Sequence, residues 1–566
     1  MGHLGTRSAS LRISLALILF VVAFSVIGAR EARAVVLSIH VSGNTLVDGS
    51  GQVVIPHGVN RMGTEYACIQ NTGIFDGPSD LASVQAMKSW TNLNMVRLPL
   101  NEDCWLGVKS GLNSAYTGAN YRNAIESYVN LLTSNGLYVI LDLHWSAPGS
   151  VPATEQQSMP DKEHSIPFWE EVANRFKTNP AVIFDLFNEP FPDCNGQRNG
   201  DTPAAWTTWR DGGTEHLRVG DEFCSQTTYE AVGMQTLVTK IRATGATNVI
   251  MVSGVGWGGI MTQWLTNKPT DDPLGQLVAS HHRYRPPNPP PSQQWCWAWS
   301  CWDSQLAPIA LQVPLVTGEL GEDAADVNCT HAFIDEYMTW ADVNKVGYLG
   351  WTWNTSPLYC LDLITSYDGT PTTYGQRYKS RFAPLFADGF NDGDYAGWTV
   401  TPPGGYWSVV SGELKASGGT AGGWAWESAG RALPSGVREF EARMATQATA
   451  TSNHGIAAMT ADLQYQILLI VDQGNTLRWS TSANGNWSGW VAAGTVDRTA
   501  LHTYTIRWDG GSLFSVLVDG VVRAPGITVD PPSVWASGIA VGMLFTQAEL
   551  SSQVLGTRFD DVVARP

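Results

Sequence analysis

The chain has 566 residues, which is too long for one hydrophobic core and predicts two or three domains. Its formal net charge of -17, with no basic run to offset it, argues against nucleic acid as a partner. Charged residues make up only 15% of the chain, while tryptophan (24), tyrosine (17) and glycine (57) are abundant. This balance is common in extracellular proteins that bind neutral, hydroxyl-rich ligands through aromatic faces.

The N-terminus has the pattern of a secretory signal peptide. Two arginines precede an apolar stretch at about residues 13–27, and an Ala-Arg-Ala sequence ending at Ala34 fits a cleavage site. We therefore expect residues 1–34 to be removed and the mature protein to be secreted, with no membrane attachment. The alternative is an uncleaved anchor, for which the apolar stretch is short.

Eight short, β-branched apolar runs follow between residues 53 and 354. They cover residues 53–60, 94–100, 138–145, 182–189, 248–255, 277–284, 313–320 and 347–354. Helical stretches separate most of them, at residues 79–90, 120–134, 164–177, 228–243 and 331–344. Eight strand-helix units predict an α/β fold, a (β/α)8 TIM barrel, whose strands are apolar throughout because both of their faces are covered.

Polar and aromatic side chains stand at the ends of these runs. In a (β/α)8 barrel the C-terminal strand ends form one rim, so such residues converge on a single cleft. They are Asn60, Arg97, His144, Asn188 with Glu189, His282 with Tyr284, Glu319, and Trp351 with Trp353. A carboxyl group at the end of a buried strand is costly unless it is paired or used for chemistry. Glu189 and Glu319 therefore predict the carboxylate pair of a glycosidase.

The composition and the hydrophobic pattern of the sequence change after about residue 385. Cysteines are absent there, and short alternating strands are separated by Gly, Asn and Asp turns. We predict an antiparallel β-sandwich (jelly-roll) domain at residues 388–566, after a catalytic barrel at residues 35–387. Its opening segment, residues 389–398, resembles a concanavalin-like or laminin-G-like module. Such modules often bind carbohydrate, and the tryptophans that could form a glycan platform are Trp398, Trp407, Trp424, Trp426, Trp479, Trp487 and Trp490.

All eight cysteines lie before residue 361, and an even number in an exported chain predicts disulfide bonds. Short separations favour Cys296 with Cys301 and Cys194 with Cys224. Between residues 285 and 302 the loop also carries four tryptophans, which either provide sugar-stacking subsites or pack into a small core of their own. These tryptophans are Trp295, Trp297, Trp299 and Trp302.

Residues 53 to 380 resemble the catalytic domain of glycoside hydrolase family 5, the cellulase family. The resemblance rests on Val96-Arg97-Leu98-Pro99, Leu141-Asp142-Leu143-His144, Phe187-Asn188-Glu189-Pro190, His282-Arg283-Tyr284, Thr317-Gly318-Glu319 and Trp351-Thr352-Trp353-Asn354, in family order. It implies a retaining endo-β-glycosidase that hydrolyses a β-1,4-glucan such as cellulose, an endoglucanase. The family also includes β-mannanases and mixed-linkage glucanases, which remain alternatives.

The chemistry assigns the two glutamates different states. Glycoside cleavage needs one protonated and one ionised carboxyl group. Glu189 is expected to be the general acid/base, with a pKa raised by the apolar barrel and by its charged partner. Glu319 is expected to be the nucleophile, and the resemblance places Arg97 beneath it to stabilise its negative charge.

The resemblance also implies supporting roles. Asn188 bonds the sugar 2-hydroxyl, Tyr284 donates to Glu319, and His144 and His282 line the subsites at the cleaved bond. Trp351 and Trp353 could form an aromatic floor, although Trp353 is equally well explained by barrel packing. No metal or organic cofactor is expected. We expect a monomer whose partner is a polysaccharide, β-glucan or mannan, and a hypothesis of another class is a non-catalytic glycan-binding protein.

Overall fold

A computed structural model of the protein describes residues 37–192, 200–285, 296, 299–322, 332–356, 361–382, 386–390, 394–401, 407–411, 413–420, 425–519, 521–535, 538–548 and 554–565. The predicted signal peptide and three of the candidate tryptophans (Trp295, Trp297 and Trp424) lie outside these residues. Within the described residues, no helix is both long and apolar enough to cross a membrane.

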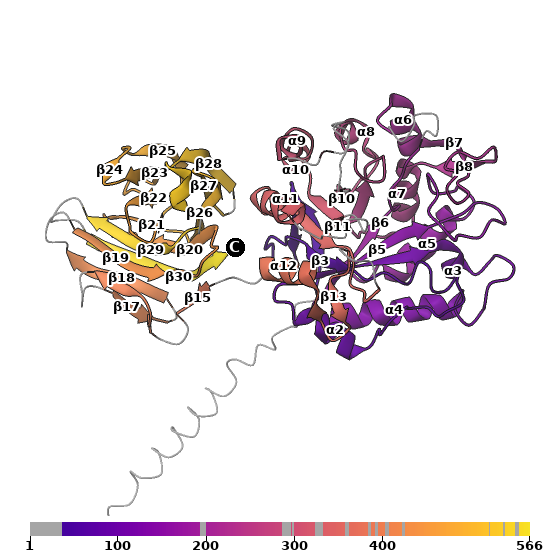
Figure 1. Cartoon of the computed structure of the whole chain (residues 1–566), viewed down its shortest axis with the longest axis horizontal. Helices are drawn as coiled ribbons and strands as arrows, with labels where there is room; N and C mark the ends of the chain where they lie inside the picture. Colours follow the sequence, from indigo (N-terminus) through magenta and orange to yellow (C-terminus); the bar gives the residue numbers. More distant parts are fainter. Residues whose placement is uncertain are drawn as a thin grey trace, which may run out of the picture.

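Eight parallel strands close into a barrel, and their order around it follows the chain (Figure 1). They are β3 (His57–Asn60), β4 (Met95–Asn101), β5 (Tyr138–Trp145), β6 (Val182–Asp185), β9 (Ile250–Ser253), β10 (Leu277–Arg285), β11 (Leu315–Glu322) and β12 (Gly347–Gly350). Pairing of β12 with β3 closes the ring. The predicted (β/α)8 barrel is therefore confirmed, and each strand falls within or overlaps its predicted run.

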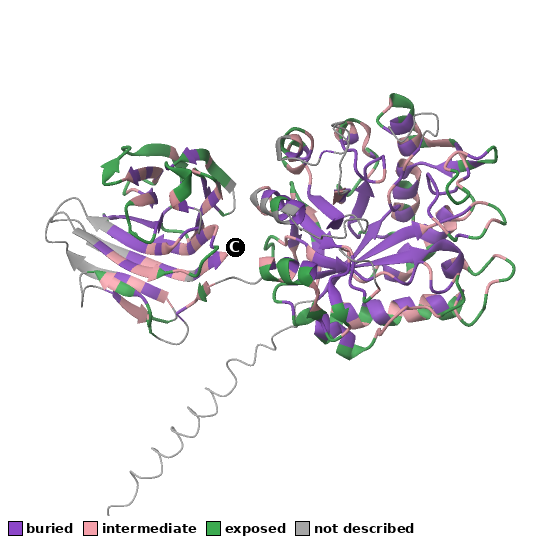
Figure 2. Ribbon diagram, viewed as in Figure 1, coloured by how far each residue is buried: buried purple, intermediate pink, exposed green. Residues whose placement is uncertain are grey.

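Alternation along the strands builds the barrel in layers. Met95, Ile140 and Ile183 form one apolar cluster, while their neighbours Val139 and Val182 belong to a second cluster shared with the helices. The strands are buried on both sides (Figure 2). Because side chains two residues apart share a face, Arg97, Asp142 and Asp185 lie on the same face as the first cluster, one layer nearer the C-terminal rim.

Helices follow most of the strands. They are α2 (Leu81–Lys88), α3 (Glu102–Leu106), α4 (Ala119–Ser134), α5 (Ser165–Phe176), α6 (Pro203–Asp211), α7 (Met234–Ala243), α8 (Trp264–Asn267), α9 (Trp299–Gln305), α10 (Ala307–Ala310), α11 (Ala332–Val343) and α12 (Thr373–Phe382). Side-chain oxygens begin several of them: Asp80 caps α2 and Thr202 caps α6. Small hairpins also belong to this domain, among them β1 (Ile39–Ser42) with β2 (Thr45–Asp48) and β13 (Ile364–Ser366) with β14 (Thr370–Pro371).

One predicted helix is partly wrong. Residues 228–232 form strand β8 (Thr228–Val232), which pairs with β7 (Gly212–His216), and α7 begins only at Met234. In β8, Tyr229 and Ala231 are buried while the residues between them are exposed. This period of two belongs to a strand, and it outweighs the helical pattern that continues after it.

The C-terminal domain consists of two antiparallel sheets, as predicted (Figure 1). One contains β17 (Trp407–Val410), β18 (Glu413–Thr420), β30 (Val554–Arg565), β20 (Glu439–Thr446), β26 (His502–Gly510), β27 (Leu513–Val518) and β28 (Val521–Thr528), with β15 (Phe386–Asp388) beside β30. The other contains β16 (Thr399–Thr401), β19 (Ala425–Ala432), β29 (Val541–Ala548), β21 (Asn453–Met459), β22 (Tyr465–Val471), β23 (Thr476–Ala483) and β24 (Asn486–Trp487), with β25 (Val491–Thr495) beside β23. A short 3-10 helix spans Pro532–Trp535.

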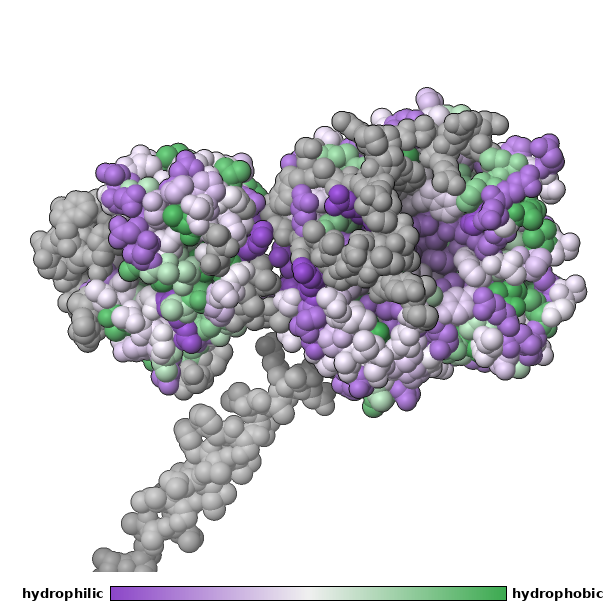
Figure 3. All heavy atoms as spheres, in the orientation of Figure 1, coloured by the Kyte–Doolittle hydropathy of each residue, from purple (hydrophilic) through white to green (hydrophobic). Residues whose placement is uncertain are grey.

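The sandwich begins slightly earlier than predicted and adjoins the N-terminal ends of the barrel strands. Phe386 of β15 already pairs with Ala564 of β30. A cavity of about 480 Å³ lies between the domains, lined by His57 at the start of β3 and by Arg565 of the sandwich. The sandwich therefore adjoins the barrel beside the N-terminal ends of β3, β4 and β12. Hydrophobic and hydrophilic residues are mixed over both domains on the face shown in Figure 3.

Disulfide bonds are present in the barrel domain. Cys296 is bonded to Cys301, as predicted, and Cys68 is bonded to Cys104, a pair that the sequence does not identify. Cys224 is also disulfide-bonded, while Cys194 lies outside the described residues.

Candidate active site

Arg97 is the centre of a buried polar layer inside the barrel. Its guanidinium donates to Asp185 (3.0 Å) and to Glu319 (2.7 Å), and it forms an ion pair with Asp142 (3.0 Å). It also donates to the side-chain oxygens of Asn188 (2.9 Å) and Asn60 (3.1 Å). One cation on β4 thus fixes five side chains that come from four other strands or the segment directly after one of them.

The charges in this layer explain its pKa shifts. Burial alone would lower the pKa of Arg97, but Asp142, Asp185 and Glu319 outweigh it and raise that pKa above its usual value. Burial likewise raises the pKa of Asp142 and Asp185, against the influence of Arg97. Both aspartates hold the arginine in place.

Glu319 lies within β11, and both of its carboxylate oxygens accept hydrogen bonds. Arg97 donates to Oε1 (2.7 Å), and Tyr284 on the neighbouring strand β10 donates its hydroxyl to Oε2 (2.6 Å). The residue is only 4% exposed. Two donors, one of them a cation, therefore fix the position of this carboxyl group.

Glu189 faces the same space in a different environment. It lies four residues beyond β6, and its backbone φ of 46° lies in the left-handed region. Its side chain is 17% exposed, and Oε1 lies 3.0 Å from Nδ1 of His282. Burial is the main cause that raises the pKa of Glu189 to about 7, although His144 and Arg97 lower it. The group can therefore carry a proton near neutral pH.

The two carboxyl groups face each other across His282. One oxygen of Glu189, one of Glu319 and a ring nitrogen of His282 all lie within 4.8 Å of one another. Nδ1 of His282 is 3.5 Å from Oε2 of Glu319. Burial lowers the pKa of His282 to about 3, so the ring is neutral, and the tautomer with hydrogen on Nδ1 can donate to either carboxylate.

Gln156, in the loop after β5, is a site residue that sequence reasoning missed. Its amide accepts a hydrogen bond from the Asn188 side chain (2.9 Å) and donates to the backbone carbonyls of Asn188 (2.9 Å) and Glu189 (2.5 Å). It therefore holds the backbone turn that presents the acid. No motif or periodicity in the sequence marks it, because it comes from an irregular loop.

The two tryptophans that follow β12, Trp351 and Trp353, lie in different surroundings. Trp351 is half-buried and stacks on His144, with ring centroids 5.6 Å apart and planes at 10°. His144 donates to or accepts from Asp142 (2.6 Å), and burial lowers its pKa to about 4. The charges of Glu319, Arg97 and Glu189 act on the His144 ring, so both rings lie beside the two carboxyl groups.

Trp353 does not line the cleft, which corrects the expectation. It is fully buried and packs edge-on against Trp90, with ring centroids 4.9 Å apart. Strand β12 ends at Gly350, so the alternation that would place Trp351 and Trp353 on one side does not apply beyond it. Trp302 of the long loop is also fully buried, against Tyr337 and Trp340.

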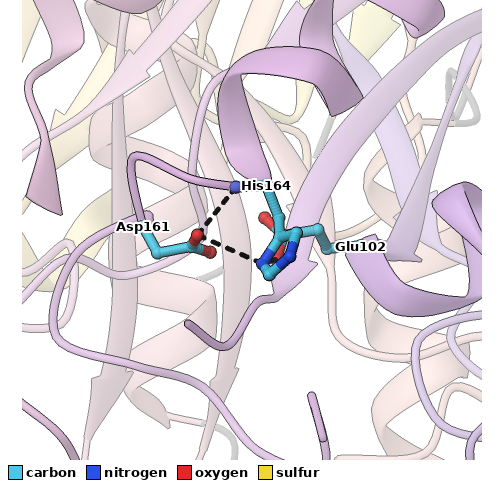
Figure 4. A group of neighbouring side chains, drawn as sticks. All are labelled: Glu102, Asp161 and His164. Carbon is cyan, nitrogen blue, oxygen red and sulfur yellow. Dashed lines mark hydrogen bonds and ion pairs between the residues drawn. The ribbon is translucent and has the colours of Figure 1, made fainter. Parts of the chain in front are cut away.

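A second group of titratable side chains lies in the same domain (Figure 4). Glu102, Asp161 and His164 have ligand-type atoms within 4.8 Å of one another. Asp161 accepts from the backbone nitrogen of His164 (2.8 Å), and Ser165 donates to Glu102 (2.5 Å). Burial raises the pKa of Glu102 well above its usual value. Hydrogen bonds at the start of α5 account for this arrangement.

A (β/α)8 barrel whose rim carries two facing carboxyl groups, one engaged by an arginine and a tyrosine, defines a glycoside hydrolase. A sequence model of the cellulase family, glycosyl hydrolase family 5, matches residues 57–357. The chain therefore belongs to glycosyl hydrolase family 5.

Characterised relatives of this chain have more than one activity. A mannan endo-1,4-β-mannosidase of Cellvibrio japonicus is 24% identical over 69% of this chain and 77% of its own length. A mannan endo-1,4-β-mannosidase of Streptomyces lividans is 26% identical over 70% of this chain and 89% of its own length. An endoglucanase of Paenibacillus polymyxa is 24% identical over 56% of this chain and 79% of its own length. The crystal structure of a β-glucanase from Saccharophagus degradans matches 61% of this chain and 92% of that chain, at 20% identity and a TM-score of 0.45.

Proposed function

We propose that the protein is a secreted, retaining endo-β-glycosidase that hydrolyses a β-1,4-glucan such as cellulose. Glu319 is the nucleophile and Glu189 the general acid/base. The observation that carries the proposal is the approach of the two carboxyl groups to within 4.8 Å, in opposite electrostatic surroundings. Retaining enzymes hold these groups about 5–5.5 Å apart, whereas inverting enzymes leave roughly 6.5–9.5 Å for a water molecule.

In the first step Glu319 attacks the anomeric carbon. The bond from that carbon to the leaving oxygen breaks, and this oxygen takes the electron pair and the proton of Glu189. Arg97 and Tyr284 donate hydrogen bonds to Glu319 and align its carboxylate before attack. The Asn188 amide, fixed by Gln156 and Arg97, is placed to bond the 2-hydroxyl of the sugar.

In the second step Glu189 works as a base. It is ionised at this point because it gave its proton to the leaving group in the first step. It then takes a proton from water, whose oxygen attacks the anomeric carbon and displaces Glu319. The product keeps its anomeric configuration, and both glutamates return to their starting states.

A β-1,4-mannan is the second candidate substrate. The two mannanase relatives align with 69% and 70% of this chain, a larger share than the 56% that the Paenibacillus endoglucanase covers. Glucose and mannose differ at C2, where Asn188 is expected to bind. Secretion is supported by the N-terminal pattern and by the disulfide bonds.

Reducing-end assays on carboxymethylcellulose, barley β-glucan, glucomannan and mannan test the proposal. The parent should cleave a glucan, and Glu319→Gln should lower its rate by roughly a thousandfold or more. Glu163→Gln, whose side chain is 66% exposed, should keep full activity. Cleavage of mannan alone would show that the substrate is a mannan and would not contradict the mechanism. A Glu319→Gln chain as active as its parent would contradict the mechanism, and a parent inactive on all four polymers would favour a glycan-binding protein.

A further inference from the structure

Two neighbouring tryptophans of the sandwich project into solvent. Trp487 is 50% exposed and Trp490 is 38% exposed. Other tryptophans of the sandwich are internal: Trp398, Trp407, Trp508 and Trp535 are buried, and Trp479 packs against the domain core. Large aromatic side chains stabilise a fold when buried, so an exposed pair that contributes nothing to the core indicates a binding surface.

The strand register places Trp487 on the outer face of its sheet. Ile467 and Leu469 of β22 point into the sandwich core. Gln466 directly precedes Ile467 on the same strand and therefore points to the opposite face. Gln466 pairs with Ser482, and Ser482 pairs with Trp487. Because cross-strand partners share a face, these three side chains lie on the same side of the sheet, where Ser482 is buried, Gln466 is half-buried and Trp487 is exposed.

The edge that carries both indoles is held in place by hydrogen bonds. The backbone nitrogen of Ser488 donates to the carbonyl of Thr481 (2.9 Å), and the Ser488 hydroxyl accepts from the backbone nitrogen of Thr481 (3.0 Å). Trp490 lies directly before β25, which pairs with β23. Two tryptophans on a fixed edge lose little conformational freedom when a ligand binds.

The chemistry of this edge selects an uncharged ligand. Residues 479–496 contain no charged side chain, in a protein with a net charge of -17. Besides the indoles, they contribute serine, threonine and asparagine. Flat apolar faces with hydroxyl and amide groups beside them complement a sugar ring, which has an apolar C–H face and a rim of hydroxyl groups. A stable interface with another protein buries roughly 800 Å² on each partner, which is more than two tryptophan side chains provide. A polysaccharide is therefore the better match for this edge.

We propose that Trp487 and Trp490 form a polysaccharide-binding site on the sandwich, separate from the cleft. The sandwich adjoins the N-terminal ends of the barrel strands, whereas the two glutamates stand at the C-terminal rim. The site holds the enzyme on an insoluble, uncharged polymer, and this inference goes beyond the proposed function.

The test measures binding separately from cleavage. The full-length chain with Glu319→Gln is mixed with microcrystalline cellulose and with insoluble mannan, and the protein left in solution is measured. Trp487→Ala with Trp490→Ala should weaken binding to at least one polymer by roughly tenfold or more. In chains with Glu319 intact, the same changes should leave hydrolysis of a soluble hexasaccharide within roughly twofold of the parent.

The matched control replaces Leu513 and Val522, which are 45% and 38% exposed on the other sheet, by alanine and should bind like the parent. Each tryptophan is also replaced singly, so that the test does not depend on one doubly substituted chain. The proposal is overturned if the tryptophan variants bind like the parent, or if the parent binds neither polymer. It is also overturned if light scattering shows a dimeric parent and a monomeric variant, because the indoles would then join two copies of the chain.

Discussion

Glu189 and Glu319 carry the same functional group in surroundings that favour opposite charge states. Glu319 receives hydrogen bonds from an arginine and a tyrosine, whereas Glu189 has a neutral histidine as its side-chain partner. His282 lies within reach of both. The difference between acid and nucleophile is therefore set by neighbours that come from other strands.

The pH dependence of the reaction should report Glu189. Because the acid must be protonated and its pKa is raised to about 7, kcat/KM should fall as the pH rises above about 7. Rates measured from pH 4 to 9 on a soluble oligosaccharide, whose leaving sugar needs a proton, should show this decline in the parent. In Glu189→Gln, assayed on an aryl glycoside whose good leaving group needs no proton, the decline should be absent. An unchanged alkaline limb in that variant would assign it to another residue.

Gln156 should act as a positioning residue. Gln156→Ala removes three hydrogen bonds to Asn188 and Glu189, so we expect kcat to fall by roughly 10- to 100-fold with little change in KM. The alkaline limb of the pH profile should also shift, since the acid changes its surroundings. The neighbouring Gln157 bonds the backbone of Arg218 instead and provides the control. If Gln156→Ala and Gln157→Ala had the same kinetics, Gln156 would not be a positioning residue.

At the scale of elements, the rim follows from alternation within β4, β5 and β6. That period of two is readable in the sequence, and it brings Arg97, Asp142 and Asp185 to one face of the barrel wall. Where a strand ends, the prediction loses its basis. Trp353 follows a strand that stops at Gly350, and Gln156 comes from a loop without periodicity. Which loop residue reaches the acid depends on tertiary packing, which local patterns do not record.

The two tryptophans after β12 should separate stability from binding. Trp353→Ala removes a fully buried ring that contacts Trp90, and it should lower the free energy of unfolding by about 3–5 kcal/mol. Trp351→Ala should change that free energy little and weaken polysaccharide binding. Denaturant unfolding together with KM measurements checks both. A Trp353→Ala chain that is as stable as Trp351→Ala would contradict this assignment.

For the whole molecule, charged side chains line the cavity between barrel and sandwich. Glu439 accepts from Arg507 (2.7 Å) and Arg565 (3.0 Å), and Lys345 of the barrel donates to the backbone of Asp519 in the sandwich (3.1 Å). Burial would raise the pKa of Glu439, but the two arginines outweigh it and lower the pKa to about 2. The ionised form is thus strongly favoured in the folded protein.

This shift predicts an acid-sensitive sandwich. A carboxyl group whose pKa is lower when folded stabilises the protein above its ordinary value of 4.5, and that stabilisation is lost as the pH falls toward about 2. The free energy of unfolding should therefore decrease over this range, and Glu439→Gln should reduce the dependence. Unfolding experiments between pH 3 and 6 on this variant and on the exposed Glu163→Gln measure the difference. Identical slopes for the two variants would contradict the assignment.

The proposed retaining mechanism depends on a covalent bond between the sugar and Glu319. A 2-deoxy-2-fluoro glycoside of cellobiose or mannobiose with a dinitrophenolate leaving group forms this bond and slows its hydrolysis. Mass spectrometry of the treated protein should show the mass of one added disaccharide, located by peptide mapping on Glu319. A label on another residue, or no label on a chain that turns over substrate and releases a product of inverted configuration, would contradict the mechanism.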